Sequence, residues 1–233
     1  MKSNDKLLND LSELAPPPNN PWCCGSTAQW ESLLTENETT LPQDYVEFVK
    51  RYGMCELWNF LRVPNPFVDA NDGNMFSVQA TQNEFFRAVC SGTEFYKKYH
   101  LSIERELLIP CLVTSNTDHF FWIASPDISA NEWRIAAVDS YAQEYCEYSV
   151  SFVHLLLDLF QGKKTAPFIP EDVEYNNRVR VVPFTDKYLA APHKPVYSSA
   201  LAGKGRLPKD YVSVVKSNAK RIYLKSVESI LHQ

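Results

Sequence analysis

Apolar side chains recur along this chain at helical spacing in some segments and in short runs in others. The clearest helical segment is 42–52, where one apolar stripe is formed by residues three or four positions apart: Tyr45, Phe48, Val49 and Tyr52. Pro42 suits the first helical position, because its missing N–H would be unpaired there anyway. Gly53 can take the left-handed conformation that ends a helix. The pattern therefore predicts a helix between these two residues.

Five further segments show helical patterns. Residues 1–25 indicate a short polar helix followed by a proline spacer at 16–18, and Ser26 can cap a helix that carries Trp30. Residues 79–99 are helical with an interruption near 91–92. Ser149 or Ser151 can cap an apolar helix that Gly162 closes, and residues 208–232 predict a long helix with one apolar side.

Strand signals occupy the middle of the chain. The run 57–63 predicts a strand that Asn65-Pro66 breaks. Residues 107–114 and 119–124 are joined by four turn-forming residues, which predicts a hairpin. Residues 133–138 predict a central strand covered on both faces, because four apolar residues stand in a row there. Short strands are expected at 145–148, on a sheet edge, and at 178–182.

Helices, then consecutive strands, then a helix are typical of the α+β class. We expect a single, largely antiparallel (mixed) sheet flanked by helices. The chain divides by pattern into an N-terminal polar and proline-rich segment (1–25), a sheet domain (26–162) and a C-terminal extension (163–233) that ends in the long helix.

Charge is distributed unevenly between these parts. Residues 1–162 hold 22 Asp and Glu against 10 Lys and Arg, a net charge of −12, whereas residues 163–233 hold 6 against 13, a net charge of +7. An acidic body repels nucleic acid and attracts basic partners, so we expect no direct nucleic-acid binding. The basic extension could bind nucleic acid or lie against the acidic body, and we expect the second.

The sequence predicts a cytoplasmic protein, because no stretch approaches the roughly 18 apolar residues of a membrane helix and the first ten residues carry no apolar signal segment. Six scattered cysteines without Cys-x-x-Cys spacing are typical of buried thiols in a reducing compartment. We therefore expect neither a disulfide nor a zinc site.

Candidate catalytic residues are sparse. Cys111 and His119 fall on adjoining strands of the expected hairpin, so a Cys–His pair is conceivable, although strand side chains alternate faces. His154 lies beside an apolar helical stripe and is interpreted as an ordinary helix residue. Asp118, Asp127 and Asp139 lack the dense spacing of a calcium loop and are interpreted as turn residues. We expect no catalytic residue, metal or cofactor.

Several motifs taken in order resemble the SUKH superfamily, the Smi–Knr homology fold. They comprise Trp30-Glu31, Leu41-Pro42-Gln43-Asp44-Tyr45 with Phe48 and Tyr52-Gly53, Phe60-Leu61 leading to Asn65-Pro66, Trp122, Trp133 with Val138-Asp139, and the helix from Ser151-Phe152 to Gly162. The resemblance covers about residues 26–162. It implies structural roles for these residues: Pro42 starts a helix, Trp30, Tyr45 and Phe48 pack, and Gly53 stops a helix.

This resemblance implies a function in binding rather than catalysis. Many bacterial members are immunity proteins that block a polymorphic toxin, commonly a nuclease or deaminase, by direct contact, and other members are regulatory or adaptor proteins. We therefore predict an immunity protein with a basic toxin as its partner; a regulatory adaptor and a cysteine-dependent enzyme are the alternatives. The expected contact carboxylates lie on turns and helix ends: Glu56, Asp69, Asp72, Asp118, Asp127 and Glu132.

Overall fold

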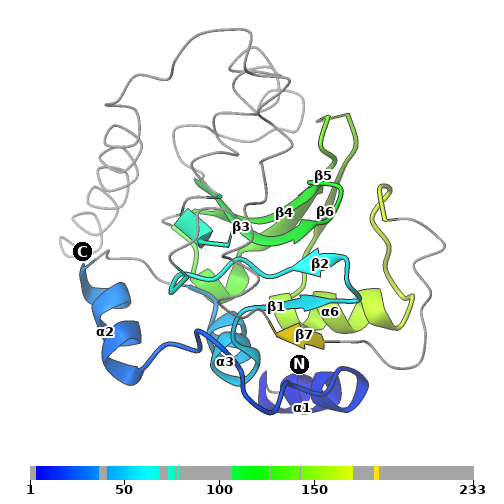
Figure 1. Ribbon diagram of the computed structural model, residues 1–233. Coiled ribbons are helices and arrows are strands. Elements are labelled where there is room, and N and C mark those ends of the chain that lie inside the picture. Colours follow the sequence, from blue (N-terminus) through cyan, green and yellow to red (C-terminus); the bar gives the residue numbers. More distant parts are fainter. Residues whose placement is uncertain are drawn as a thin grey trace, which may run out of the picture.

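The protein is described by a computed structural model, which places residues 4–36, 41–68, 73–76, 78, 107–125, 127–141, 143–169 and 181–183 (Figure 1). Three helices come before the first strand: α1 (Asn4–Leu14), α2 (Thr27–Glu36) and α3 (Gln43–Tyr52). Helix α6 (Phe152–Phe160) follows the consecutive strands of the middle of the chain. The predicted α+β class is confirmed.

One antiparallel sheet organises the described residues. Its strands are β1 (Cys55–Leu57), β2 (Leu61–Arg62), β3 (Leu107–Thr114), β4 (His119–Ala124), β5 (Arg134–Val138), β6 (Tyr145–Tyr148) and β7 (Val181–Pro183). They lie in the order β6-β5-β4-β3-β2-β1-β7, and every neighbouring pair is antiparallel. Strand β6 lies at one edge of the sheet, as predicted for residues 145–148.

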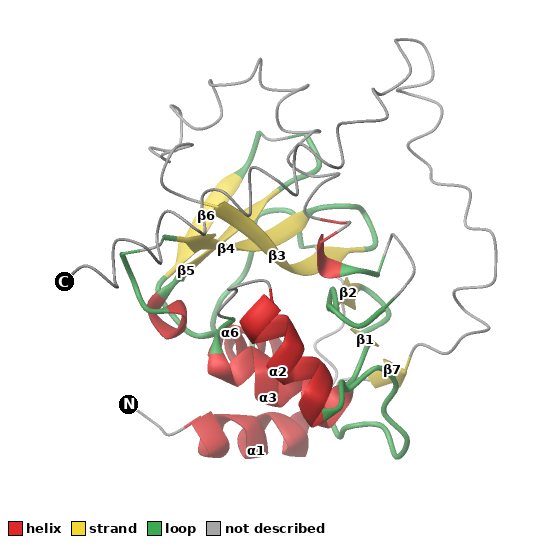
Figure 2. Ribbon diagram, turned by 90° about the vertical axis from the view of Figure 1, so that its left-hand side faces the viewer, coloured by secondary structure: helices red, strands yellow, loops and turns green. Residues whose placement is uncertain are grey.

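Helices α1, α3 and α6 gather on one side of this sheet (Figure 2). The stripe of α3 faces the sheet, and its four residues have no exposed surface. The Tyr45 ring meets Trp122 of β4 edge-on at 5.0 Å and Phe152 of α6 at 5.4 Å between ring centroids. Edge-to-face aromatic pairs of this kind stabilise a core beyond the area that they bury. The stripe predicted from spacing alone therefore joins α3, α6 and the sheet.

Helix α3 ends as the sequence predicts, at a glycine with positive φ. Gly53 has φ 64° and ψ −153°, and its amide donates to the Val49 carbonyl at 2.8 Å. This backbone region is almost exclusive to glycine. A Cβ at this position would lie 2.1 Å from the Trp22 carbonyl oxygen. Gly53 is therefore required both by its own conformation and by the close approach of the segment before α2.

The predicted hairpin is confirmed at both strands. Residues 107–114 pair with 119–124, and a bulge interrupts the register between Pro110 and Leu112. The apolar run of β5 is also confirmed as covered on both faces, because residues 135–138 are all fully buried.

The single strand predicted over Leu57–Val63 is wrong. Strands β1 and β2 occupy this region as a tight hairpin, in which Leu57 pairs with Leu61. Trp58 and Asn59 take φ values of 58° and 55°, and the Phe60 amide donates to the Leu57 carbonyl at 3.0 Å. Two successive positive φ angles are typical of a hairpin turn that glycine or asparagine usually supplies. A tryptophan in the first turn position conceals the turn in the sequence.

Asn65, predicted only as a strand breaker, connects three segments. Its side-chain amide donates to the Cys23 carbonyl at 2.9 Å, and its Oδ1 accepts from the Phe67 amide at 2.8 Å. Its backbone amide donates to the Gly73 carbonyl at 2.9 Å. The residue is fully buried, so its polar groups are satisfied inside the protein.

The hydrophobic core continues across both predicted domain limits. Helix α1 buries Leu7, Leu8 and Leu11 in the same core as α3 and α6, so residues 1–25 contribute to the domain. After Gly162, the core includes Ala166 and Ile169, and β7 pairs with β1. The strand expected at 178–182 is therefore observed at 181–183 as part of the sheet. The helical patterns at 79–99 and 208–232 lie outside the described residues.

Candidate functional site

The predicted contact carboxylates do not form one cluster. Asp127 and Glu132 are exposed in the loop between β4 and β5, where Asp127 precedes the 3₁₀ turn η1 (Ala130–Glu132) and Glu132 ends it. Glu56 is half-buried on β1 and lies opposite Arg62 of β2. Asp69 and Asp72 lie outside the described residues. The structure therefore brings together only the two carboxylates of the β4–β5 loop.

Asp118 is not on the surface, where the prediction placed it. Its side chain is 4% exposed. Oδ2 accepts from the Thr114 hydroxyl at 2.7 Å, and Oδ1 accepts from the Ser140 amide at 3.0 Å. This carboxylate holds the β3–β4 turn against the β5–β6 turn, so it cannot serve as an exposed contact point.

The conceivable Cys111–His119 pair does not form. Cys111 is fully buried in the core that the helices cover, and burial raises the pKa of its thiol well above the usual value. His119 precedes Phe120, which belongs to that core, so the alternation of strand side chains directs His119 to the opposite face. Burial lowers the pKa of His119 to about 3. A thiol and an imidazole on opposite faces of a sheet cannot exchange a proton.

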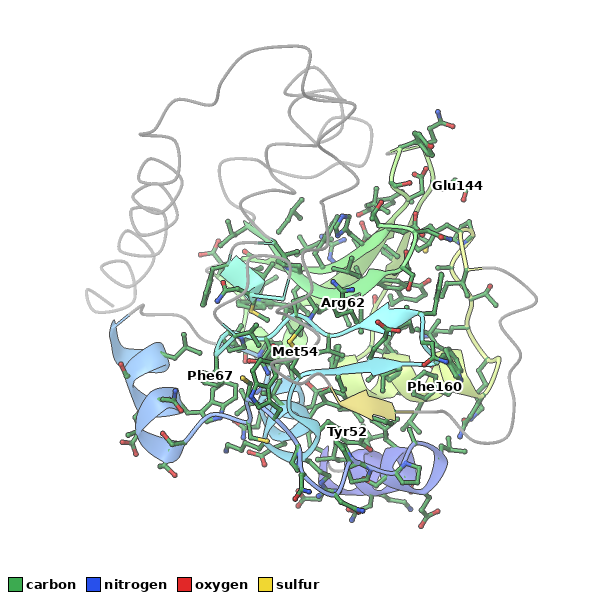
Figure 3. All side chains as sticks on the ribbon, in the orientation of Figure 1. Tyr52, Met54, Arg62, Phe67, Glu144 and Phe160 are labelled. Carbon is green, nitrogen blue, oxygen red and sulfur yellow. The ribbon has the colours of Figure 1, made fainter. Side chains whose placement is uncertain are left out.

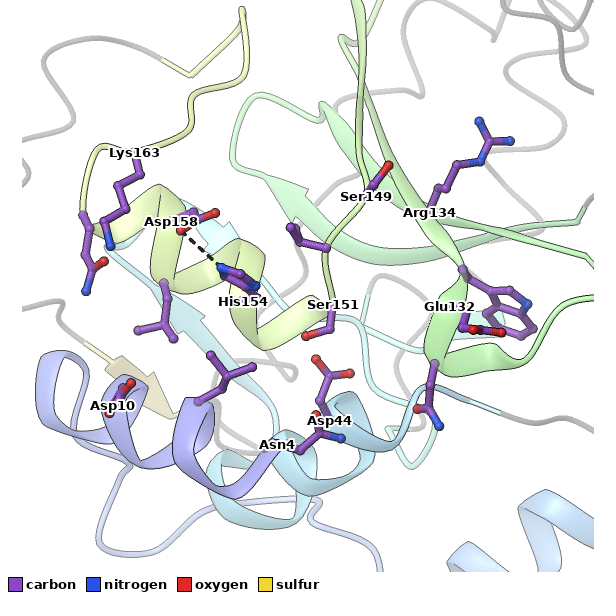
Figure 4. A pocket seen from close by; sticks show the side chains of 16 residues that line it. Asn4, Asp10, Asp44, Glu132, Arg134, Ser149, Ser151, His154, Asp158 and Lys163 are labelled. Carbon is purple, nitrogen blue, oxygen red and sulfur yellow. Dashed lines mark ion pairs between the residues drawn. The ribbon is translucent and has the colours of Figure 1, made fainter. Parts of the chain in front are cut away.

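A groove of about 890 Å³ opens between α1, α6 and the β4–β5 loop (Figure 4). We call it the α1–α6 groove. Its walls carry Asn4, Leu7 and Asp10 of α1, Glu132, Trp133 and Arg134 after the loop, and His154, Leu157 and Asp158 of α6, with Asp44, Asn131, Ser149, Val150, Ser151, Gln161 and Lys163 completing the lining. Glu132 is the predicted contact residue that lines it.

Asp44 lies at the bottom of this groove and caps a helix other than its own. It is 3% exposed, and its Oδ2 accepts from the Val153 amide in the first turn of α6 at 2.8 Å. Ser151, at the N-cap position of α6, makes no side-chain capping bond, so Asp44 supplies the missing acceptor. Burial raises the pKa of Asp44, and the hydrogen bond from Val153 opposes this shift. Asp44 therefore fixes α6 against α3.

The α6 segment contains the three residue types of a nucleophilic triad, Ser151, His154 and Asp158, but not its geometry. Nε2 of His154 lies 3.6 Å from Oδ1 of Asp158, whose other oxygen lies 3.4 Å from Nζ of Lys164. A serine nucleophile requires a hydrogen bond to its base. Within the part of the chain that the structure describes, no hydrogen bond joins Oγ of Ser151 to the imidazole of His154. The arrangement therefore lacks the contact that would activate Ser151.

The groove itself was not predicted, because its lining comes from segments more than a hundred positions apart. One local signal was present in the sequence. His154 and Asp158 stand four residues apart on one helix, which is the spacing of a side-chain pair. Asn131, beside Glu132, has a side-chain oxygen that accepts from the Gln43 amide at 2.7 Å, and it joins the loop to the start of α3.

Carboxylates outnumber cations across the described residues, where 15 Asp and Glu stand against 7 Lys and Arg. Several of these cations are held within the protein: Lys50 pairs with Glu47, Arg134 with Glu147 and Lys164 with Asp158. Arg51 binds the side chains of Asn9 and Ser12 on α1. Without the buried Asp44, Asp118, Asp139 and Asp158, 11 carboxylates remain against the 7 cations, so the described surface carries a net negative charge. Part of its positive charge is already matched.

Comparisons with known proteins give no match: no family model, no curated protein and no solved structure is similar to this chain. Among the described residues, no group of three or more His, Cys, Asp or Glu side chains could hold a metal ion. No helix in those same ranges is long and apolar enough to cross a membrane.

Proposed function

We propose that this chain is a SUKH-type immunity protein that binds and neutralises a toxin of the nuclease or deaminase type by direct contact. The element order supports the fold part of the proposal, since α2 and α3 precede an antiparallel sheet that α6 closes. The resembling motif residues also have the structural roles expected of them. Trp30, Tyr45, Phe48 and Tyr52 are buried, and Gly53 ends α3.

The excess of carboxylates is the observation that carries the functional part. A toxin that acts on nucleic acid must attract phosphates and therefore presents a basic surface. An acidic inhibitor is steered toward such a surface, which increases the association rate, and it can cover the active site. Buried apolar and aromatic contacts then determine how slowly the complex dissociates.

The β4–β5 loop is the contact surface that we propose. Asp127 and Glu132 are both exposed there, and neither forms an ion pair within the described ranges. Ile128 lies between them and is 47% exposed, which makes it one of two large apolar side chains exposed in the described residues. An apolar anchor with carboxylates around it is typical of the centre and rim of a protein interface.

The test is a charge reversal with a matched control. The Asp127→Lys/Glu132→Lys variant should bind the toxin encoded by the neighbouring gene about tenfold or more weakly than the natural chain, because charges on an interface rim mainly affect association. The control, Glu13→Lys/Glu144→Lys, makes the same change of charge at two exposed carboxylates elsewhere and should bind normally. Affinity is measured by titration calorimetry at two salt concentrations, and protection by growth of cells that produce the toxin.

Undiminished protection by the folded Asp127→Lys/Glu132→Lys variant would reject this contact surface. Absence of any complex with the neighbouring gene product, together with capture of a host regulatory protein, would instead support an adaptor of the same fold.

A further inference from the structure

The lining of the α1–α6 groove combines an apolar floor with acidic walls. The apolar floor is formed by three side chains that are each less than 8% exposed: Leu7, Trp133 and Leu157. Carboxylates line the same groove from α1 and from the β4–β5 loop, namely Asp10 and Glu132. A segment with one apolar side and basic residues beside it is complementary to such a surface.

The lining of the groove holds more carboxylates than cations: Asp10, Asp44, Glu132 and Asp158 against Arg134 and Lys163. Arg134, one of its two Lys or Arg residues, is paired with Glu147 outside the groove. Asp158 is shared between His154 and Lys164. Lys163 is the other cation of the lining, whose charge is negative overall, so a basic occupant gains electrostatic attraction there.

The chain itself contains a sequence of this chemistry. Residues 208–232 carry Lys or Arg at five positions: Lys209, Lys216, Lys220, Arg221 and Lys225. Apolar residues recur at helical spacing in the same segment: Val212, Val215, Ala219 and Ile222. Its only carboxylates are Asp210 and Glu228, so it has a net positive charge.

Chain length permits this segment to reach the groove. The last described residue is Pro183, where β7 lies beside β1. Residues 184–207 can span up to about 80 Å when extended, at about 3.3 Å for each residue. A folded unit of this size has a radius of gyration of about 16 Å. Attachment to the same chain also gives the segment an effective concentration of about millimolar.

We propose that residues 208–232 dock in the α1–α6 groove, with basic side chains toward Asp10 and Glu132 and the apolar side toward Leu7 and Leu157. The docked segment covers Glu132. A partner that binds the β4–β5 loop must therefore displace the segment, which makes the extension a competitor of that partner. The docking itself does not depend on the proposed function.

The test uses the full chain alone and a carbodiimide, which joins a carboxylate directly to a lysine amine that touches it. Mass spectrometry of the digested monomer should find links from Lys216, Lys220 or Lys225 to Asp10 or Glu132, in at least severalfold excess over links to Glu13 and Glu144. Mixing ¹⁵N-labelled and unlabelled chains identifies links between two copies.

Two variants of the segment keep every lysine and every groove carboxylate. Val215→Asp/Ile222→Asp places charge on the apolar side and should reduce the groove links severalfold. Ser213→Asp/Ser217→Asp makes the same change of net charge at polar positions and should retain more of them. Three results would each overturn the docking: equal yields of groove links in the two variants, links to Glu13 and Glu144 as frequent as those to the groove, or links only between two copies. None of these results bears on toxin binding.

Discussion

The two ends of the central strands use their acidic residues in opposite ways. At the turn end, where the β3–β4 turn (115–118) meets the β5–β6 turn (139–144), Asp118 and Asp139 are buried and accept backbone hydrogen bonds. At the loop end, the β4–β5 loop (125–133) exposes Asp127 and Glu132. Acidic residues near turns are therefore not equivalent: Asp118 and Asp139 stabilise their turns from inside, whereas Asp127 and Glu132 are available to a partner.

The turn end also carries one exposed carboxylate, Glu144. Glu144 projects at the tip of the β5–β6 turn, away from the helices (Figure 3). Its backbone amide donates to Oδ1 of Asp139 at 2.7 Å. The buried carboxylate of Asp139 therefore stabilises the turn, and the exposed carboxylate of Glu144 lies at its tip. Two predictions examine this contrast and a third concerns another buried carboxylate, from the largest expected effect to the smallest.

Replacing Asp118 by alanine should reduce the free energy of unfolding by about 3 kcal/mol, because it leaves the buried Thr114 hydroxyl and the Ser140 amide without their acceptor. The matched change Asp127→Ala should cost less than about 0.5 kcal/mol, as is usual for exposed positions. Urea unfolding followed by circular dichroism measures both. A similar loss of unfolding free energy in the two variants would contradict the contrast between the turn end and the loop end.

Asp139 allows a graded test. Its Oδ1 accepts from the Gln143 and Glu144 amides, and Oδ2 accepts from the Tyr141 amide at 3.2 Å. Asp139→Ala should cost about 2 kcal/mol, less than Asp118→Ala, because water can reach part of this turn. Asp139→Asn keeps one oxygen and should cost about half as much. If the asparagine and alanine variants unfold at the same urea concentration, the amide bonds do not stabilise the turn.

Asp44 supplies the smallest effect and a pH dependence. Burial raises its pKa in the folded protein, so the folded state retains a proton that the unfolded state has already lost. Its contribution to stability is greatest below the unfolded pKa and decreases as pH rises to the folded pKa. As pH rises over this range, the natural chain should therefore lose stability relative to the Asp44→Asn variant. Above the folded pKa, the difference in unfolding free energy between the two should become constant. A difference that moves in the opposite direction would show that the Val153 bond outweighs burial.

Local patterns predicted the parts of the fold that depend on local spacing. The α3 stripe, its glycine end and the hairpin of β3 and β4 were all predicted correctly, since periodicity and turn residues specify them. The 57–63 strand was not, because Trp58 adopts a conformation usually supplied by glycine or asparagine. Sequence could not show the helix-capping role of Asp44 either, since its partner Val153 stands 109 residues away.

The candidate surface was predicted only in part for a related reason. Asp127 and Glu132 were predicted to be exposed because turns at the ends of strands usually are, and both are exposed. Asp118 met the same criterion but is buried, because its turn packs against another turn that follows the next strand. Burial of this kind depends on the register between strands, which a single sequence does not specify.

The late position of β7 has a consequence for any shortened form of this protein. Strand β1 is flanked by β2 on one side and, on the other, by residues more than a hundred positions downstream, Val181–Pro183. A fragment that stops at Gly162 would leave the outer backbone groups of β1 without this neighbour. Such open edges pair readily with other chains and promote aggregation. A fragment of this protein that is to stay dispersed must therefore extend at least through Pro183.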